Sequence, residues 1–342
     1  MEKIKFGIVG CGVIAPHHAR GIASTPEAEL VAVCDVIQER ADKLSAEFGD
    51  PAVYTDYNKM FAEGGVDAVC VCVPSGLHGQ VTIDAAKAGK HVMCEKPIEI
   101  TLEKIDAMVA ACHEAKVKLG VIFQRRTSPI WHKVKKVVDE GKLGKMVLGD
   151  AYLKYFRSQE YYDSGDWRGT WELDGGGALM NQGVHMIDLQ RWIMGPIKTM
   201  YAKADHLVRN IEVEDTACAV MEFASGAFGV LQGTTSVVKM NHRMELHGEV
   251  GTIVVDGEKI TKWEVPGDDS GGEPDKEVEI GSAASDPKAI ASGGHGIQIQ
   301  DLCRAIIEDR DPMIVGEEAR KAVEVILAVY ESARTGLPVK MS

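Results

Sequence analysis

Short apolar runs alternate with amphipathic stretches over the first third of the chain. Six runs are predicted to be buried parallel strands, because each is brief and dense in apolar residues. The stretches between them have helical spacing or composition, and several end at glycine. The predicted strands are 4–9, 30–34, 52–54, 66–73, 91–94 and 119–123, and the predicted helices are 14–24, 36–50, 57–63, 77–88 and 101–115. This alternation predicts a doubly wound parallel sheet over 1–123.

The alternation stops after residue 123. A helix over 130–140 and a strand over 146–156 are followed by a strongly predicted helix over 178–194, which ends at Gly195-Pro196. Five strands then follow without helices between them, which predicts an antiparallel sheet. These strands are 200–208, 216–223, 228–236, 243–248 and 252–255, and after them come a hairpin and surface loop over 257–294 and helices over 297–308 and 317–335.

The fold class is therefore α/β, with two domains. Residues 1–123 form a nucleotide-binding type of parallel-sheet domain, and residues 124–342 form an α/β domain with a large, open, mainly antiparallel sheet. The closing helices over 297–335 are expected to pack back toward the first domain.

A glycine pattern follows the first predicted strand. Gly10, Gly12 and Ala15 match G-x-G-x-x-A, the dinucleotide-binding fingerprint. Gly10 permits the tight turn, Gly12 leaves room for a pyrophosphate, and Ala15 lets the next helix pack closely. Val13 and Ile14 lie at the start of that helix, where backbone N–H groups point at phosphates.

Asp35 ends the second predicted strand, where an acid accepts hydrogen bonds from the ribose hydroxyls of the cofactor. Its charge repels a 2′-phosphate, and Val36-Ile37 offers no Ser-Arg pair to bind one. We therefore expect NAD rather than NADP, although Arg40 lies close enough to belong to the cofactor site.

Ligands of such sheets bind beyond the carboxyl ends of the strands. The segments 74–78, 95–97 and 124–126 follow three strands and should converge there with the glycine loop. The cofactor contacts expected in these segments are Pro74, Ser75, Leu77, His78, Glu95, Lys96, Pro97 and Gln124. Lys96 stands beside the stiff Pro97, and a lysine near a cofactor can serve in proton transfer. The alternative is a surface lysine in a tight loop.

The helix over 178–194 carries a second group of polar residues. Asn181 and His185 are four residues apart and should share one helix face, while Asp188 is spaced to hold the second imidazole nitrogen. An imidazole held in this way suits a general base near neutral pH. The alternative is that Asn181 and His185 merely satisfy local hydrogen bonds.

Two further basic positions are candidates for the site. Trp167 and Arg168 precede this helix, offer a flat ring and a bidentate donor, and are expected to contact the cofactor as well. Arg126 follows the sixth strand. Either arginine is suited to a carboxylate or phosphate, and the alternative is exposed charge. His17 and His18 follow the glycine loop and are not expected to be catalytic.

Composition and charge exclude some classes of binding partner. The 342 residues carry a net charge of −13, which excludes a nucleic-acid or anionic-membrane surface. The eight cysteines lie largely in apolar runs and are expected to be reduced and buried, without a metal site. No secretory or membrane-spanning segment is recognisable, which favours a cytoplasmic location.

Taken together these motifs resemble the Gfo/Idh/MocA oxidoreductase family over nearly the whole chain. The resemblance rests on GIVGCGVIA at 7–15, VCVPSGLH at 71–78, CEKPI at 94–98, DGGGALMNQGVHMID at 174–188 and AVEVILAVYESARTG at 322–336. It implies a Rossmann domain followed by an open-sheet domain. It also implies that Lys96 contacts both substrate and nicotinamide, that His185 is the acid–base residue, and that Asn181 orients the substrate where many members carry aspartate.

The activity implied by the resemblance is NAD-dependent oxidation of a secondary hydroxyl of a sugar, glycoside or nucleotide-sugar, with oxidation at C3 to a 3-keto sugar in some similar members. Arg126, Arg168, Asn181, Lys96 and His185 would contact this substrate. The alternatives are an inositol or polyol dehydrogenase, a cyclic ketone reductase, and an NAD-dependent glycosidase without net redox change. The open sheet implies a homodimer or homotetramer.

Overall fold

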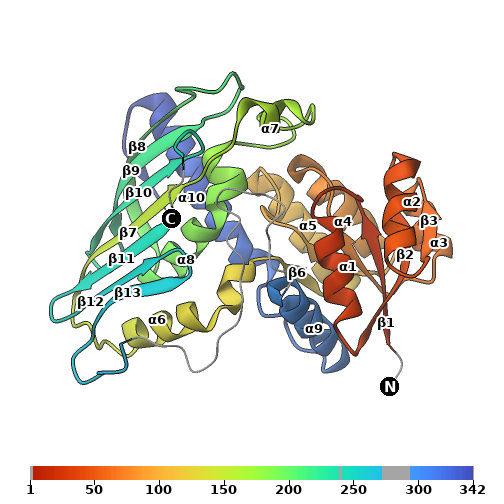
Figure 1. Ribbon diagram of the computed structural model, residues 1–342, viewed down its shortest axis with the longest axis horizontal. Helices are drawn as coiled ribbons and strands as arrows, with labels where there is room; N and C mark the ends of the chain where they lie inside the picture. Colours follow the sequence, from red (N-terminus) through yellow and green to blue (C-terminus); the bar gives the residue numbers. More distant parts are fainter. Residues whose placement is uncertain (1–2, 239–240, 272–292, 342) are drawn as a thin grey trace. The chain divides into compact units, whose positions relative to one another are not determined.

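A six-stranded parallel sheet forms the centre of the first of two units in the computed structural model, which describes residues 3–238, 241–271 and 293–341 (Figure 1). Its order is β3-β2-β1-β4-β5-β6, the order of a dinucleotide-binding Rossmann sheet. The strands are β1 (Ile4–Val9), β2 (Ala28–Cys34), β3 (Ala52–Tyr54), β4 (Ala68–Val71), β5 (His91–Cys94) and β6 (Leu119–Val121). The parallel sheet predicted from the apolar runs is thereby confirmed.

Helices alternate with these strands. They are α1 (Ala15–Ala23), α2 (Gln38–Glu47), α3 (Tyr57–Glu63), η1 (Ser75–Leu77), α4 (His78–Lys87) and α5 (Leu102–Ala115). The start of α5 shows why the sequence folds in this way locally. The Thr101 hydroxyl accepts a hydrogen bond from the Lys104 N–H at 3.3 Å and so caps the helix.

The first unit also includes a segment from late in the chain. The first unit comprises Met1–Gln124 and Ile290–Arg320, and α9 (Gly293–Ile307) therefore belongs to this unit. Ile299 and Leu302 of α9 are fully buried in one core with Phe6 and Ile8 of β1. This late helix therefore completes the hydrophobic core of the parallel-sheet unit.

The second unit comprises Arg125–Ala289 and Lys321–Ser342 and is built on an eight-stranded sheet. The order is β13-β12-β11-β7-β10-β9-β8-β14, and its pairs are antiparallel except that β7 and β10 are parallel. The strands are β7 (Met146–Lys154), β8 (Ile197–Asp205), β9 (Thr216–Phe223), β10 (Phe228–Thr234), β11 (Arg243–Gly248), β12 (Thr252–Asp256), β13 (Lys259–Glu264) and β14 (Val339–Lys340). The mainly antiparallel sheet is thus confirmed.

Besides α9, the helical elements that follow β6 in the described residues are η2 (Gln124–Thr127), α6 (Pro129–Asp139), α7 (Gln159–Asp163), η3 (Ala178–Gly183), α8 (Val184–Met194) and α10 (Gly316–Thr335). From Lys321 onward α10 belongs to the second unit. Of the loop predicted over 257–294, residues 272–292 lie outside the described residues, and the part before them contains β13.

The predicted single helix over 178–194 is wrong in its first six residues, which form the π-helix η3 rather than α-helix. A π-turn contains more residues than an α-turn and is frequent at functional sites. Asn181 lies in this π-turn and His185 in the first turn of α8, so the predicted stacking of the two spans the junction between a π-turn and an α-helix.

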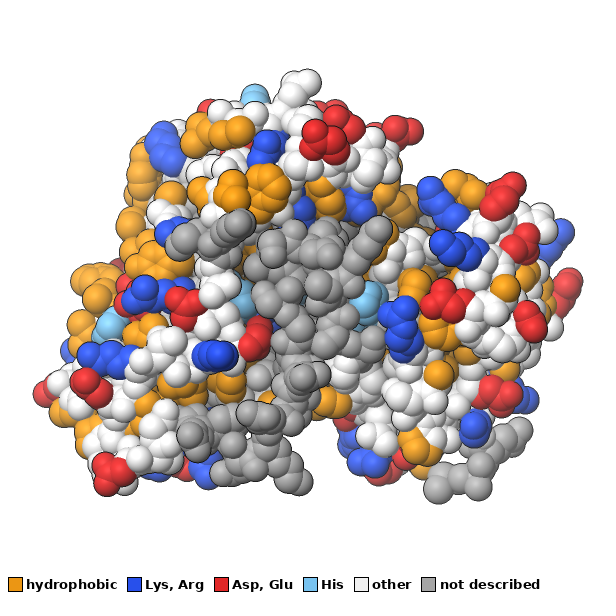
Figure 2. Space-filling view, in the orientation of Figure 1, with side chains coloured by type: hydrophobic (Ala, Val, Ile, Leu, Met, Phe, Trp, Pro, Cys, Tyr) orange, Lys and Arg blue, Asp and Glu red, His pale blue; other side chains and the backbone are white. Residues whose placement is uncertain are grey.

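The face of the molecule drawn in Figure 2 is not divided into regions of one charge sign. In Figure 2, basic and acidic side chains of the described residues are interspersed over the visible face. Among the helices that the structure describes, none combines the length and apolar character needed to cross a membrane.

Gly10 and Gly12 provide a test of the glycine loop. Gly10 has φ +92°, and a Cβ there would lie 2.6 Å from the Cys72 carbonyl oxygen, whereas a Cβ at Gly12 would meet nothing within 4 Å. Gly10→Ala should lower the free energy of unfolding by about 1–3 kcal/mol. Gly12→Ala should change it by less than about 0.5 kcal/mol. Urea unfolding of both variants checks this, and equal losses would contradict it.

Candidate active site

The turn after β1 has the shape that a dinucleotide requires. Gly10 makes a sharp turn against the end of β4, and Ala15 is fully buried at the start of α1. Beside Gly12 the space that a Cβ would fill is open, and Val13 is half exposed. These residues fit NAD, because the loop leaves space for a pyrophosphate next to the N-terminus of α1.

Asp35 lies directly after β2 and is nearly buried. Its Oδ2 accepts the Cys11 N–H at 2.7 Å, and its Oδ1 accepts the Ile37 N–H at 2.9 Å. A carboxylate offers about four acceptor positions, so two hydrogen bonds leave capacity for ribose hydroxyls. Asp35 therefore fixes the glycine loop besides serving as the expected cofactor ligand, while Arg40 is exposed on α2.

His78 is buried. Its Nδ1 lies 2.8 Å from the Pro97 carbonyl oxygen and its Nε2 lies 2.9 Å from the Val73 carbonyl oxygen. Burial lowers the pKa of His78, although both carbonyls favour its charged form. The ring thus ties the turn after β4 to the turn after β5, and a direct contact of His78 with the cofactor stays a prediction.

Lys96 follows Glu95 in the turn after β5 and is partly exposed, whereas Glu95 and Pro97 are buried. The Lys96 N–H donates to Glu95 Oε2 at 3.1 Å, and the Lys96–Pro97 peptide bond is cis. Ser75 is buried in the neighbouring turn, while Pro74, Leu77 and Gln124 keep partly or largely exposed side chains. Lys96 therefore stands at the carboxyl edge, where ligands of this sheet bind.

The π-turn of the second unit presents an amide. Asn181 Nδ2 donates to Asp174 Oδ1 at 2.7 Å, and Gln182 Nε2 donates to Asn181 Oδ1 at 3.2 Å. Asp174 is buried, and its Oδ2 accepts the Gly169 N–H at 2.9 Å. An aspartate at position 181 would therefore face a second carboxylate, which explains physically why an amide suits this place.

Asp188 of α8 forms a buried ion pair with Arg126, while its contact with His185 stays a prediction. Arg126 Nε and Nη2 donate to Asp188 Oδ2 and Oδ1 at 2.7 and 2.6 Å, and both side chains are buried. The Arg126 guanidinium also lies 5.0 Å from the centre of the Trp192 ring. Arg126 does meet a carboxylate, as its chemistry suggested, but that carboxylate belongs to α8 of the same chain, next to His185.

The Arg168 guanidinium contacts the aromatic rings of Trp167 and Tyr161. The Arg168 guanidinium lies 4.3 Å from the centre of the Tyr161 ring and 4.5 Å from that of Trp167. Arg168 Nη1 also donates to the Tyr161 hydroxyl at 2.5 Å, and Gln182 Nε2 reaches the same oxygen at 3.2 Å. This network connects Arg168 to Asn181 through Gln182.

Glu214 accepts hydrogen bonds from backbone N–H groups at the start of the π-turn. Its Oε2 accepts the Gly177 N–H at 2.9 Å, and its Oε1 accepts the Leu179 N–H at 2.8 Å and the Tyr330 O–H at 3.0 Å. A Cβ on Gly177 would lie 1.9 Å from the Glu214 carbonyl oxygen. Burial raises the pKa of Glu214 to about 7 against these hydrogen bonds.

The predicted site residues thus form two groups, one in each unit. The parallel-sheet unit holds the glycine loop, Asp35, Ser75 and Lys96, and the second unit holds Arg126, Arg168, Asn181 and His185. Sequence reasoning missed the positioning roles of Asp174, Glu214 and Tyr161. Asp174 is followed by Gly175, Gly176 and Gly177, and three glycines in a row are the signal in the sequence for the close approach of another segment.

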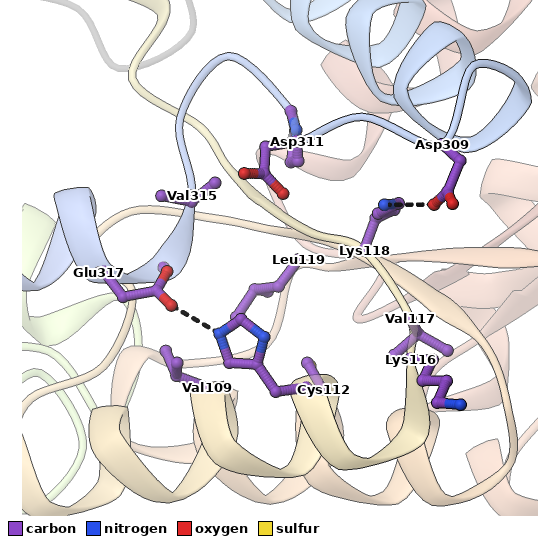
Figure 3. Close-up of a pocket in the computed structure, with 13 residues that line it drawn as sticks. Val109, Cys112, Lys116, Val117, Lys118, Leu119, Asp309, Asp311, Val315 and Glu317 are labelled. Carbon is purple, nitrogen blue, oxygen red and sulfur yellow. Dashed lines mark hydrogen bonds and ion pairs between the residues drawn. The ribbon is translucent and has the colours of Figure 1, made fainter.

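A pocket of about 350 Å³ in the first unit lies elsewhere (Figure 3). His113 Nε2 lies 2.6 Å from Glu317 Oε1 along its walls, and Figure 3 shows Lys118 directed at Asp309. Lys118 directly precedes β6, so this pocket adjoins the amino end of that strand. Ligands of doubly wound sheets bind at the opposite, carboxyl end, and the pocket is therefore not part of the candidate active site.

Two family models match the chain. Residues 4–123 match an oxidoreductase family with an NAD-binding Rossmann fold, and residues 131–254 match the GFO/IDH/MocA C-terminal domain.

Similar proteins have been characterised or solved. Myo-inositol 2-dehydrogenase of Thermotoga maritima is 30% identical over 75% of this chain and 77% of its own. D-glucoside 3-dehydrogenase of Escherichia coli is 26% identical over 99% and 98%. The WlbA dehydrogenase from Bordetella pertussis, solved with NADH and UDP-GlcNAcA, is 33% identical over 100% and 99%, with a TM-score of 0.89.

The cap on the π-turn predicts a pH-dependent stability. Because the pKa of Glu214 rises from 4.5 to about 7 on folding, the native state binds the proton more tightly, and stability falls as pH rises across that interval. Glu214→Gln removes this titration. The free energy that the substitution costs should therefore be larger at about pH 5 than at about pH 8. Urea unfolding at both pH values measures it, and equal costs would contradict the cap's protonation.

Proposed function

Because the chain belongs to the Gfo/Idh/MocA family of oxidoreductases and carries an NAD-binding Rossmann domain, we propose that it oxidises a secondary hydroxyl of a sugar, in particular of a nucleotide-sugar or glycoside. The observation that carries this proposal is the similarity to the WlbA dehydrogenase over the full length of both chains. The similarity to D-glucoside 3-dehydrogenase extends the proposal to oxidation at C3.

In the proposed reaction, His185 accepts the proton of the substrate hydroxyl while the carbon of that hydroxyl loses a hydride and becomes a ketone carbon. NAD, when bound, supplies the acceptor for the hydride. Lys96 polarises the reacting oxygen with its ammonium group. Arg126 forms a buried ion pair with Asp188, which lies three residues after His185 on α8. This ion pair restrains the helix turn that carries the His185 imidazole.

The second-unit network supports a role in binding the sugar. The amide of Asn181 both donates and accepts hydrogen bonds, as a ring hydroxyl requires of its partner. The Arg168 guanidinium lies 4.3 and 4.5 Å from the Tyr161 and Trp167 ring centres, and a guanidinium is suited to bind a carboxylate or a phosphate. We propose that these side chains set the selectivity among sugars, while Lys96 and His185 carry the chemistry.

A polyol such as an inositol is the second candidate substrate, and the 30% identity to myo-inositol 2-dehydrogenase favours it. A panel of UDP-sugars, glycosides and inositols, each supplied with NAD and followed by NADH absorbance, separates the two. Turnover of a UDP-sugar or glycoside with a 3-keto product supports the proposal, and turnover of inositols alone would replace it.

Lys96→Ala and His185→Ala should each lower kcat on the oxidised sugar by about 10²–10⁴-fold, the usual contribution of one acid–base group. Affinity for NAD, measured by fluorescence titration, should change little. Lys43→Ala and His206→Ala, at exposed positions of the first and second units, are the matched controls. Near-normal kcat in either site variant removes that residue from the mechanism.

We also propose that the chain forms a homodimer or homotetramer through the outer face of the eight-stranded sheet. Tyr201, Val220 and Val230 are neighbours across β8, β9 and β10, and Leu148 pairs with Phe228 on the same face. Tyr201, Val220, Phe228 and Leu148 are all exposed in the single chain. A contiguous apolar patch of this kind marks an interface.

Val220→Lys should shift the assembly toward monomer, because it places a charge in the centre of the patch. Val250→Lys is the control, since Val250 has 57% exposure against 56% for Val220 but lies outside the strands. Sedimentation equilibrium measures both variants and the parent chain. A parent chain that is already monomeric would overturn this assembly.

A further inference from the structure

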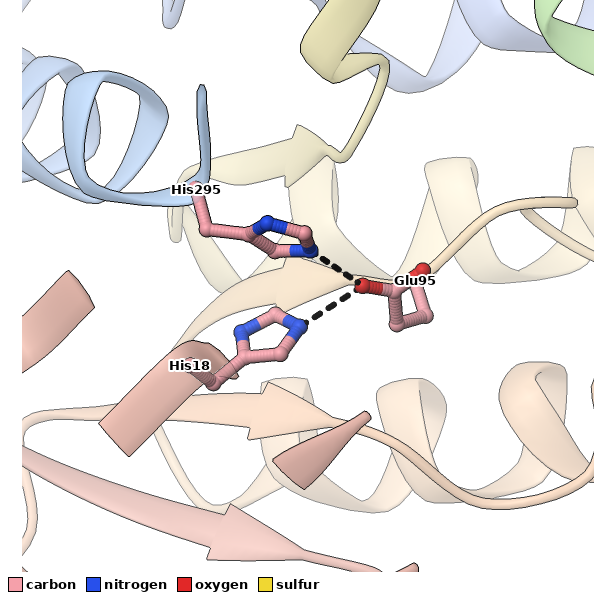
Figure 4. Close-up of side chains that lie close together, drawn as sticks. All are labelled: His18, Glu95 and His295. Atoms are coloured by element: carbon pink, nitrogen blue, oxygen red, sulfur yellow. Dashed lines mark hydrogen bonds and ion pairs between the residues drawn. The ribbon is translucent and has the colours of Figure 1, made fainter. Parts of the chain in front are cut away.

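Two imidazoles from distant parts of the chain meet at the buried carboxylate of Glu95 (Figure 4). His18 on α1 and His295 on α9 both direct Nε2 at Glu95 Oε1, at 2.8 and 3.2 Å. Each side chain is almost wholly shielded from solvent, with 0% exposure for both imidazoles and 6% for the carboxylate. All three belong to the first unit.

The second oxygen of the same carboxylate leads to Lys96. Glu95 Oε2 accepts the Lys96 backbone N–H at 3.1 Å. On the other side of Lys96, His78 Nδ1 lies 2.8 Å from the Pro97 carbonyl oxygen. The backbone on both sides of Lys96 is thus held by buried side chains, by Glu95 within the turn and by His78 from another segment.

We propose that His18 and His295 are positioning residues for Lys96. They fix the Glu95 carboxylate, and its second oxygen fixes the backbone from which the Lys96 side chain extends. This inference rests on the proposed role of Lys96 in the reaction. A positioned ammonium group matters because a small displacement of a reacting group lowers the rate far more than it lowers binding.

The charges of the cluster are consistent with this role. Burial raises the pKa of Glu95, but the hydrogen bonds from His18 and His295 hold it well below its usual range. Burial lowers the pKa of His18, yet its contacts with Cys72 and Glu95 raise that pKa to about 10. The pKa of His295 is lowered by burial, so one proton on His18 balances the charge of Glu95.

A divalent metal is the competing occupant, because His18 Nε2, His295 Nε2 and a Glu95 oxygen lie within 4.8 Å of one another. An imidazole bound to metal through Nε2 carries its hydrogen on Nδ1 and normally donates it to a neighbour. Neither His18 Nδ1 nor His295 Nδ1 has a hydrogen-bond partner among the described residues. A metal would leave two such N–H groups unsatisfied, whereas a proton on His18 leaves one.

The test compares His295→Leu, which removes the donor, with His295→Gln, which keeps an N–H donor on a flexible side chain. Deuterium exchange of the peptide that contains Lys96 should be faster in His295→Leu than in the parent chain and partly restored in His295→Gln. The kcat on the oxidised sugar should fall roughly 10–100-fold in His295→Leu, with KM and NAD affinity nearly unchanged, and recover in His295→Gln.

His113→Leu is the matched control, because His113 also pairs with a glutamate, Glu317, but both are exposed. It should leave exchange and kcat unchanged. Unchanged exchange at Lys96 in His295→Leu overturns the inference, as does a stoichiometric metal in the purified chain that His295→Leu loses. Full activity of Lys96→Ala would instead remove the proposed catalytic role, while the exchange measurement still decides whether the cluster positions this turn.

Discussion

A carboxylate that is taken out of water has to be surrounded by hydrogen-bond donors, and this requirement shapes the turns on which the candidate site is built. Asp35 draws in the N–H of the glycine loop, Glu95 that of Lys96, Asp174 that of Gly169, and Glu214 those that open the π-turn. Each carboxylate thereby converts a flexible loop into a defined one.

The pKa of a buried acid in this protein depends on its hydrogen-bond partners. Burial raises the pKa of Glu214 to about 7, because its donors are two backbone N–H groups and a hydroxyl, without a cation. Burial also disfavours the charge of Glu95, but two imidazoles more than compensate and keep its pKa low. A buried glutamate can therefore be protonated near neutral pH in the second unit, as Glu214 is, and stay ionised in the first unit, as Glu95 does.

The comparison with the sequence shows where periodicity is informative. The parallel first sheet, the mainly antiparallel second sheet and the glycine turn all followed from local patterns, because apolar periodicity and glycine spacing act over a few residues. The helix over 178–194 was wrong at its start, since apolar periodicity does not distinguish a π-turn held open by Glu214 from an α-turn. Likewise, no local spacing indicated that Arg126, 62 residues away along the chain, holds Asp188 bidentately.

By itself, the sequence determined the parallel-sheet architecture, the NAD-binding turn and the identities of Lys96 and His185 as candidates, because these depend on residue type and short spacing. Only the tertiary structure decided which side chains surround them. His18 lies 77 residues and His295 lies 200 residues from Glu95 along the chain. Contacts at that separation are created when helices pack on a common core, and no local pattern of apolar and polar residues encodes which two will meet.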